Sequence, residues 1–370
     1  MKSYLSNRKQ FVSVNGVDSN HKLIKYGVPQ GSILGPLIFV IYINDLPKIN
    51  NLAKFILYAD DANIIITATT LEEVINETQK LINSLVNWVD SNGLALNIDK
   101  TKFMIFSRKS LAPKAPLLLL GKKIEQIKEA KFLGVIIDEK LTWSHHIKTV
   151  TSKMSRYIGV LSQIKSYLPL NARLQIYHCL IQSHVNYCSL IWGFSSNSNI
   201  DSIFRIQKKG VRAIVPGFIN YFYKQGIQPG HTKPYFREYK ILTIHSIVAL
   251  NSLLFVHKSR NFRDSLPLEV SSTISPDSPS YQATIESAET WLSKYNTSVF
   301  RSSVFFKGPL LSTRPEFNRF LGKLILTPQQ YKKELKGTIL GLQTSGSDNE
   351  WDPKNFITFN IPGLRQSSRT

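Results

Sequence analysis

The stretch Lys54–Thr67, KFILYADDANIIIT, decides the fold of the first part of the chain. Apolar residues on both sides of Asp60 and Asp61 predict two short strands joined at the two aspartates. Two like charges placed side by side between buried strands are unfavourable unless a cation lies between them. Carboxylate oxygens suit Mg²⁺, so the turn is a candidate metal site for phosphoryl transfer. The pair alone is a weak signal, because a chain of this length contains about one Asp-Asp by chance.

The segments around this stretch alternate between strand and helix patterns. Asn15-Gly16 predicts a hairpin turn within the first 30 residues. Thr70 and Glu73 form a capping-box pattern, which predicts a helix that ends near Gly93. The other expected elements are a helix at 35–45 and strands at 94–96, 102–106 and 131–137.

From Ser144 onward the pattern becomes helical. An apolar stripe predicts one helix after Ser144, a second opens at Pro169 and continues past Cys188, and a third covers 199–214. Between residues 145 and 215 there are nine Lys or Arg and one acidic residue, Asp201. A helix is expected at 242–256, a linker at 271–280 and another helix at 283–295.

Composition limits the class of protein. The 370 residues suggest two or three domains, and 46 Lys+Arg against 25 Asp+Glu give a net charge of +21. This excess predicts a polyanionic partner, nucleic acid rather than an anionic membrane, although a solvated basic surface is the alternative.

Cys179 and Cys188 are expected to be free, buried thiols in a reducing compartment. With no apolar run long enough to span a bilayer and no signal core, we expect an intracellular protein, in the nucleus or cytoplasm, with no membrane partner.

Two further segments are candidate binding elements. The loop Gly27–Ser32, GVPQGS, has glycines that let a ligand approach the backbone closely, and Gln30 could hydrogen-bond a base or sugar edge. An ordinary helix-entry loop is the alternative. Lys100 could meet a phosphate or protonate a leaving pyrophosphate, and a plain surface lysine is its alternative.

Four motifs in order over residues 28–135 resemble a known family. They are VPQGSILGPLIF, YADD, GLALNIDKTK and FLGV. Together they resemble the later blocks of reverse transcriptases, and VPQG with YADD is most similar to the enzymes of non-LTR (LINE-type) retrotransposons. The stretch from Leu141 to Gly217, including NYCSLIWG at Asn186–Gly193, resembles the thumb of those enzymes.

The resemblance implies an α/β fold: a partial polymerase palm of antiparallel strands and packed helices at 1–140. A helical thumb at 141–217 and an irregular C-terminal region of uncertain structure at 218–370 would follow. The implied activity is RNA-directed DNA polymerisation with Mg²⁺ or Mn²⁺ as cofactor, and RNA template, DNA primer and deoxynucleoside triphosphates as partners. The primer 3′-hydroxyl would attack the α-phosphate of the nucleotide.

The resemblance also assigns residues to roles. Asp60 and Asp61 would bind the metals, and Lys100 would assist departure of pyrophosphate. The pocket for nucleotide and template would include Pro29, Gln30, Gly31 and Tyr58, and the primer grip would be Phe132, Leu133 and Gly134. Contacts to the nucleic-acid backbone would come from Lys148, Lys153, Arg156, Lys208, Lys209 and Arg212.

One part of the family pattern is missing from this sequence. The family has a third metal-binding aspartate on a strand well before the VPQG loop, whereas here the acidic residue before Val28 is Asp18, without an apolar strand around it. We therefore expect a truncated fragment that polymerises little or nothing alone. The alternatives are an inert nucleic-acid-binding remnant, a pseudogene product, or an unrelated metal-dependent phosphodiesterase.

Overall fold

The structure is a computed structural model, and it describes residues 2–24, 27–29, 31–107, 113, 115–215, 232–261 and 328–345. Contacts between its elements divide the chain into two compact units, Met1–Lys128 and Glu129–Thr370. Each unit is described by itself. The predicted helix at 283–295 and linker at 271–280 lie outside the described residues.

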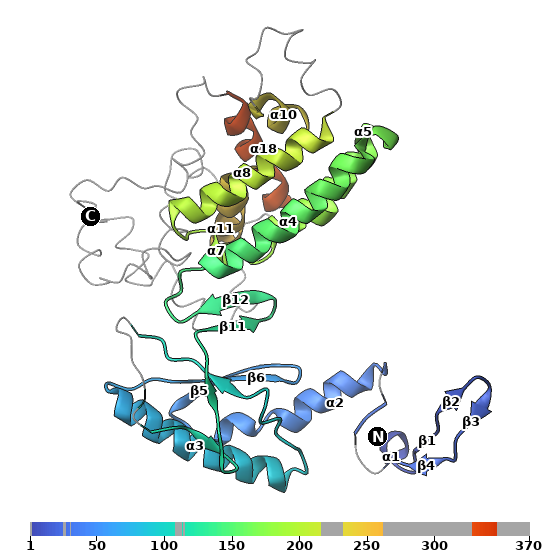
Figure 1. The fold of residues 1–370 in the computed structure, drawn as a ribbon, viewed down its shortest axis with the longest axis vertical. Helices are drawn as coiled ribbons and strands as arrows, with labels where there is room; N and C mark the ends of the chain where they lie inside the picture. Colours follow the sequence, from blue (N-terminus) through green and yellow to red (C-terminus); the bar gives the residue numbers. More distant parts are fainter. Residues whose placement is uncertain are drawn as a thin grey trace. The chain divides into compact units, whose positions relative to one another are not determined.

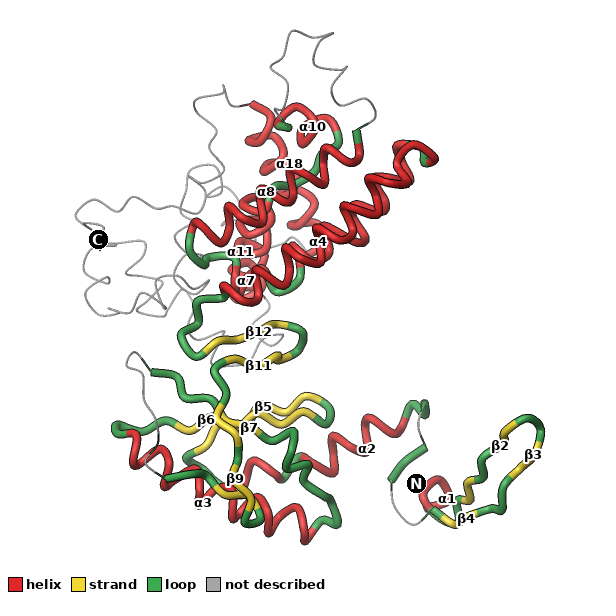
Figure 2. Tube along the Cα trace, viewed as in Figure 1, coloured by secondary structure: helices red, strands yellow, loops and turns green. Residues whose placement is uncertain are grey.

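The first unit is a mixed helix and strand unit whose strands form two-stranded pairs (Figure 2). Asn15 and Gly16 both have positive φ, at 52° and 80°, and form the predicted turn between β2 and β3. The described elements are α1 (Lys2–Leu5), β1 (Lys9–Gln10), β2 (Ser13–Val14), β3 (Val17–Asp18), β4 (Lys22–Leu23), α2 (Leu34–Ile43), η1 (Leu46–Ile49), β5 (Ala53–Tyr58), β6 (Asp61–Ile66), α3 (Leu71–Ser91), β7 (Lys102–Phe103), β8 (Leu118–Leu119), β9 (Lys122–Lys123) and β10 (Glu125–Gln126).

Helix α3 begins and ends as its sequence predicts. The Thr70 hydroxyl accepts from the Glu73 backbone N–H at 3.2 Å, and the Glu73 carboxylate accepts from the Thr70 N–H at 3.2 Å. Hydrogen bonds from the Thr69 hydroxyl and the Thr70 N–H lower the pKa of Glu73. The helix ends at Ser91, and Gly93 follows with φ +63°. The capping box satisfies N–H groups that a helix otherwise leaves unpaired at its start.

The predicted strand at 94–96 is wrong. Residues 94–97 form no strand, and Leu96 instead packs against a small core formed by Ile82, Leu117, Leu119 and Ile124. The Gln79 side chain joins α3 to β8 beside this core. Its Nε2 donates to Leu118 O at 2.9 Å, and its Oε1 accepts from the Leu118 N–H at 2.8 Å. Side-chain packing on α3 therefore replaces the strand ladder that the apolar alternation suggested.

The second unit combines one hairpin with packed helices (Figure 1). Residues 131–137, predicted as one strand, form a hairpin because Leu133 and Gly134 have φ +45° and +85° and reverse the chain. The described elements are β11 (Glu129–Phe132), β12 (Val135–Asp138), α4 (Ser144–Ile164), η2 (Lys165–Tyr167), α5 (Leu170–Ile176), the π-helix η3 (Tyr177–Gln182), α6 (Ser183–Asn186), α7 (Ser189–Trp192), α8 (Asn197–Ile214), α10 (Lys233–Glu238), α11 (Ile244–Asn261) and α18 (Pro328–Ser345).

The predicted long helix from Pro169 past Cys188 is interrupted. It passes through the π-helical turn at 177–182, and Cys188 has φ +51°, which stops it before α7. Both thiols are free as predicted, but Cys179 is exposed and Cys188 half-buried, so the expectation that both are buried is wrong.

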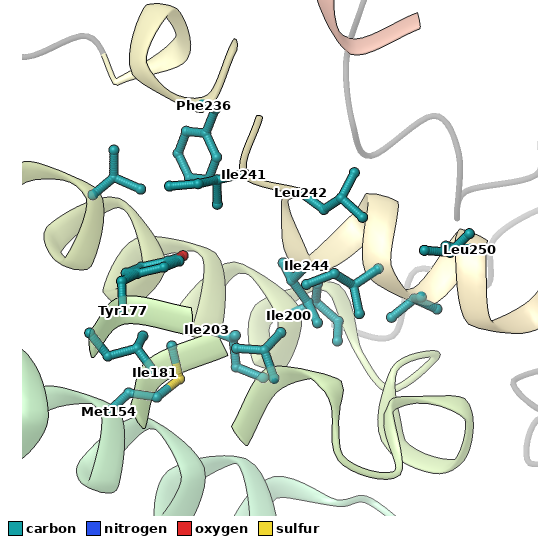
Figure 3. Close-up of a cluster of buried hydrophobic side chains, with 14 of the residues drawn as sticks. Met154, Tyr177, Ile181, Ile200, Ile203, Phe236, Ile241, Leu242, Ile244 and Leu250 are labelled. Carbon is teal, nitrogen blue, oxygen red and sulfur yellow. The ribbon is translucent and has the colours of Figure 1, made fainter. Parts of the chain in front are cut away.

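The helices of the second unit share one apolar core (Figure 3). Met154 of α4, Tyr177 of η3 and Ile203 of α8 are fully buried in it. The side-chain amide of buried Gln207 extends this core, donating to Leu242 O at 2.8 Å and accepting from Ile244 N at 2.9 Å. Burying each large apolar side chain stabilises the fold by about 1.5–3 kcal/mol.

The C-terminal region is helical where the structure describes it. The predicted helix at 242–256 is confirmed as α11, and α18 packs against it with Tyr331, Leu335 and Ile339 buried. The expected irregular region is therefore wrong for 232–261 and 328–345. Helix α11 is buried on most sides, so it lacks the polar face that makes a helix conspicuous in a sequence.

His146 makes the second unit sensitive to acid. Its ring is buried, its Nδ1 accepts from the Ile136 N–H at 3.3 Å, and burial together with the nearby Lys153 charge lowers its pKa to about 4. Between pH 6.5 and pH 4 the unfolded chain binds a proton that the folded chain does not. Stability is therefore complete above pH 6.5 and falls as the pH drops toward 4.

We predict that wild-type protein loses about 2 kcal/mol of unfolding free energy between pH 7 and pH 4.5 relative to His146→Asn. The asparagine oxygen can still accept from Ile136 but does not titrate. Urea unfolding monitored by circular dichroism at the two pH values measures the difference. Equal pH dependence in the two proteins would contradict the prediction.

Candidate active site

The two aspartates lie at the tip of a hairpin. Strands β5 and β6 pair antiparallel from Ala53 opposite Ile66 to Tyr58 opposite Asp61, so Ala59 and Asp60 form a two-residue turn. Ala59 has φ +51°, a left-handed conformation that costs a non-glycine residue roughly 1 kcal/mol. Backbone strain of this kind collects at functional sites, where the surrounding structure holds it in place.

The carboxylates of the turn are accessible. Asp60 and Asp61 are both exposed, and the side chain of Tyr58 beside them is 62% exposed. Among the described residues, no cation pairs with either carboxylate and no side chain donates to it. Two adjacent carboxylates with free oxygens fit a hard divalent cation that keeps other ligands from water or phosphate.

The loop before α2 is described except at Gln30, which lies outside the described residues. Pro29 is half-buried and Gly31 is exposed with φ +80°. The Ser32 hydroxyl then accepts from the Gly35 N–H at 3.1 Å, just before α2 begins at Leu34. Helix α2 follows with an exposed apolar surface that includes Leu37, Val40 and Ile41.

Lys100 lies in the turn that follows α3. Its backbone N–H donates to Asn97 Oδ1 at 3.1 Å, and its side chain is exposed. No described hydrogen bond or ion pair joins Lys100, Pro29 or Gly31 to the aspartates. The structure thus shows these predicted residues as accessible within one unit, without a direct contact between them.

The predicted primer-grip residues lie at the tip of the β11–β12 hairpin. Phe132 pairs with Val135, and Leu133 and Gly134 form the two-residue turn, in which Leu133 is 39% exposed. The Tyr187 hydroxyl donates to Leu133 O. A Cβ on Gly134 would lie 3.3 Å from the Tyr187 ring, so the ring packs tightly on the turn.

The predicted backbone-binding residues lie on two packed helices. Lys148, Lys153 and Arg156 are exposed on α4, Lys209 is exposed on α8, and Lys208 and Arg212 are half-exposed on α8. Lys208 Nζ lies 4.4 Å from the centre of the Phe204 ring, a cation–π contact that restrains it. Helices α4 and α8 lie side by side, and Asn199 at the start of α8 bonds Thr142 O before α4 (Figure 1).

Comparison with known proteins finds a family match over the residues that contain the Asp60-Asp61 hairpin. Residues 1–137 match the family described as reverse transcriptase (RNA-dependent DNA polymerase). The predicted resemblance to the enzymes of non-LTR retrotransposons is confirmed by relatives from mobile elements.

The chain is similar to proteins of mobile elements, including two from Drosophila. The chain is 32% identical over 226 residues to the probable RNA-directed DNA polymerase from transposon BS of Drosophila melanogaster, covering 58% of this chain and 25% of that protein. It is 27% identical to the RNA-directed DNA polymerase from mobile element jockey of Drosophila funebris, covering 58% and 24%. The chain therefore spans about a quarter of the length of these relatives. No solved structure matches.

Two residues of the NYCSLIWG motif have contacts that the sequence did not reveal. Tyr187 contacts the Leu133-Gly134 turn, and Gly193 lies so close to α11 that a Cβ would meet Val248 Cγ2 at 2.4 Å. Their separation from these partners exceeds 50 residues, so no local pattern indicates the contacts. The NYCSLIWG motif was the one sequence feature that could have indicated them, because a simple amphipathic helix needs neither its Tyr nor its Gly.

The turns Leu133-Gly134 and Leu120-Gly121 allow a matched test of the primer-grip assignment. Both leucines have left-handed φ, 45° and 50°, which Asn tolerates better. We predict that Leu133→Asn and Leu120→Asn each raise the unfolding free energy by about 0.5–1 kcal/mol. Only Leu133→Asn should weaken binding of a primer–template duplex, measured by fluorescence anisotropy. Equal duplex affinities for the two variants would contradict the assignment.

Proposed function

We propose that this chain forms part of the RNA-directed DNA polymerase of a mobile element, acting inside the cell, in the nucleus or cytoplasm. The observation that carries the proposal is the exposed Asp60-Asp61 turn at the tip of the β5–β6 hairpin, within residues 1–137. Residues 1–140 would contribute the palm and residues 141–217 the helical thumb. The β11–β12 hairpin, which packs with the helical unit, would then belong to the palm.

In this proposal Asp60 and Asp61 hold Mg²⁺ or Mn²⁺ through their free carboxylate oxygens. Divalent cations at such a site supply charge stabilisation for phosphoryl transfer. Tyr58, Pro29, Gln30 and Gly31 would line the pocket for the deoxynucleoside triphosphate and the template base. Lys100, exposed on its turn, would approach the triphosphate and give a proton to the leaving pyrophosphate.

The second unit would bind the RNA template and DNA primer. Lys148, Lys153 and Arg156 on α4 and Lys208, Lys209 and Arg212 on α8 would contact phosphates. Phe132, Leu133 and Gly134 would contact the primer near its end. Phosphate contacts of this kind release counterions, so affinity should fall steeply as salt rises.

The chain alone should polymerise weakly. Within the described residues, no group of three or more His, Cys, Asp or Glu could hold a metal ion, so the two aspartates have no third protein ligand there. A metal site that lacks a ligand loses affinity and activity. The alternative function, an inert nucleic-acid-binding remnant, is favoured by the basic residues of α4 and α8. No helix in the described part of the chain is long and apolar enough to cross a membrane.

The test combines primer extension with duplex binding. The 370-residue chain and Asp60→Asn receive an RNA template, a DNA primer, deoxynucleoside triphosphates and Mg²⁺ or Mn²⁺. We predict little or no extension, and any extension should disappear in Asp60→Asn. Strong extension that survives in Asp60→Asn would contradict the role of the turn, and strong extension that depends on Asp60 would contradict only the predicted weakness.

Binding of the same duplex at two salt concentrations tests the second unit. We expect Lys209→Gln to weaken binding and to reduce the slope of log K against log salt by about 0.7–0.9. The same substitution at exposed Lys333 of α18 serves as the matched control and should leave the slope unchanged. Equal slopes for the two variants, or no binding by the wild type, would contradict the proposed duplex surface.

A further inference from the structure

The β11–β12 hairpin is tied to the helices of the second unit at both of its ends. At its base, the Glu129 carboxylate bonds the His145 ring, and Asp138 Oδ2 accepts from the Trp143 N–H at 2.8 Å. Along β12, the Ile136 N–H donates to His146 at 3.3 Å. At its tip, Tyr187 donates to Leu133 O. The hairpin therefore belongs to the same compact unit as α4 and α8.

The tip contact is specific to this turn. The chain contains a second Leu-Gly turn of the same geometry, Leu120-Gly121, with φ 50° and 76°. A Cβ on Gly121 would meet nothing within 4 Å, whereas a Cβ on Gly134 would meet the Tyr187 ring at 3.3 Å. The two Leu-Gly turns thus share similar φ angles, and a tyrosine ring packs on Leu133-Gly134 but not on Leu120-Gly121.

Tyr187 is held in place by a break in the helices. Helix α6 ends at Asn186 because Tyr187 is extended, and Cys188, with φ +51°, separates it from α7. The buried Trp192 donates from Nε1 to Tyr187 O at 3.0 Å, and its ring lies 5.8 Å from that of His146. The backbone of Tyr187 is therefore fixed by a buried side chain, while its hydroxyl reaches the hairpin turn.

We propose that Tyr187 is a positioning residue that locks the Leu133-Gly134 turn to the helical unit, so that the turn and the basic helices α4 and α8 engage a primer–template duplex as one rigid body. The inference rests on the proposed function, because it concerns the duplex that this unit would bind. It adds a residue, Tyr187, whose side chain need not contact nucleic acid itself. The free energy of duplex binding would then include no cost for ordering the turn.

The closing experiment compares Tyr187→Phe with Tyr167→Phe. Both substitutions remove one hydroxyl, but Tyr167 is 86% exposed on the surface of the same unit and serves as the matched control. Amide hydrogen exchange of the 131–137 segment, measured in the free protein, reports whether the turn is held. Fluorescence anisotropy gives the Kd for a recessed primer–template junction and for an internal duplex whose ends are closed by loops.

We expect Tyr187→Phe to speed exchange at the 131–137 segment and to raise the Kd for the junction about three- to tenfold, the size expected for losing the hydrogen bond to Leu133 O. The Kd for the internal duplex and the exchange of α4 should not change, and Tyr167→Phe should change nothing. A purely structural role would instead weaken both Kd values and loosen α4. Unchanged exchange, or faster exchange with an unchanged junction Kd, would overturn the proposal.

A second pair of variants approaches the same contact from the hairpin. Gly134→Ala and Gly121→Ala both place a Cβ at positive φ, but only Gly134→Ala also presses on Tyr187. We expect only Gly134→Ala to weaken junction binding, and its effect should be non-additive with that of Tyr187→Phe. Additive effects would overturn the proposed contact. If the wild-type protein binds neither duplex, the proposed function itself is contradicted. If the wild type binds and Tyr187→Phe binds the junction equally well, only the role of Tyr187 is contradicted.

Discussion

Trp192 is the side chain on which the arrangement of the second unit depends. Its indole is fully buried, its Nε1 donates to Tyr187 O, and its ring lies beside that of His146 on α4. Through these contacts it fixes the break at Cys188, the start of α4 and, through Tyr187, the tip of the β11–β12 hairpin. The close approach of Gly193 to Val248 adds α11 to the same centre. One buried residue thus links the proposed primer grip to the helices that carry the basic side chains.

The first unit exposes two acidic side chains at one turn, whereas the charged side chains that the second unit exposes on α4 and α8 are mainly basic. The Asp60-Asp61 turn is exposed and its carboxylates have no protein cation among the described residues, so the negative charge there is available to a metal ion. The helical unit has the opposite balance, with Lys and Arg on the outer faces of α4 and α8 around a continuous apolar core. Within the first unit the exposed carboxylates could bind a cation, and within the second unit the basic side chains could bind a polyanion.

The sequence predicts local features of this fold well and long-range contacts poorly. The capping box at Thr70, the Asn15-Gly16 turn and the aspartate hairpin were predictable, because each depends on residues a few positions apart. The strand at 94–96 failed because packing on α3 replaces strand pairing, and the turn at Leu133-Gly134 was missed because leucine seldom adopts positive φ. The contact between Tyr187 and Leu133 joins residues 54 positions apart, which no local pattern encodes. For the site, the sequence indicates which residues are candidates. The structure was needed to show that Asp60 and Asp61 are exposed and that Tyr187 joins the Leu133-Gly134 turn to the helices.

The central claim is that the Asp60-Asp61 turn binds a catalytic divalent metal ion, and iron-directed cleavage tests it most directly. Fe²⁺ replaces Mg²⁺ in the presence of a deoxynucleoside triphosphate, ascorbate and peroxide generate hydroxyl radicals, and mass spectrometry maps where the backbone is cut. The account predicts cleavage within a few residues of Asp60 that is lost in Asp60→Asn and retained when exposed Asp90 on α3 is changed to Asn. Cleavage that is absent from the turn, or that persists in Asp60→Asn, would contradict the account.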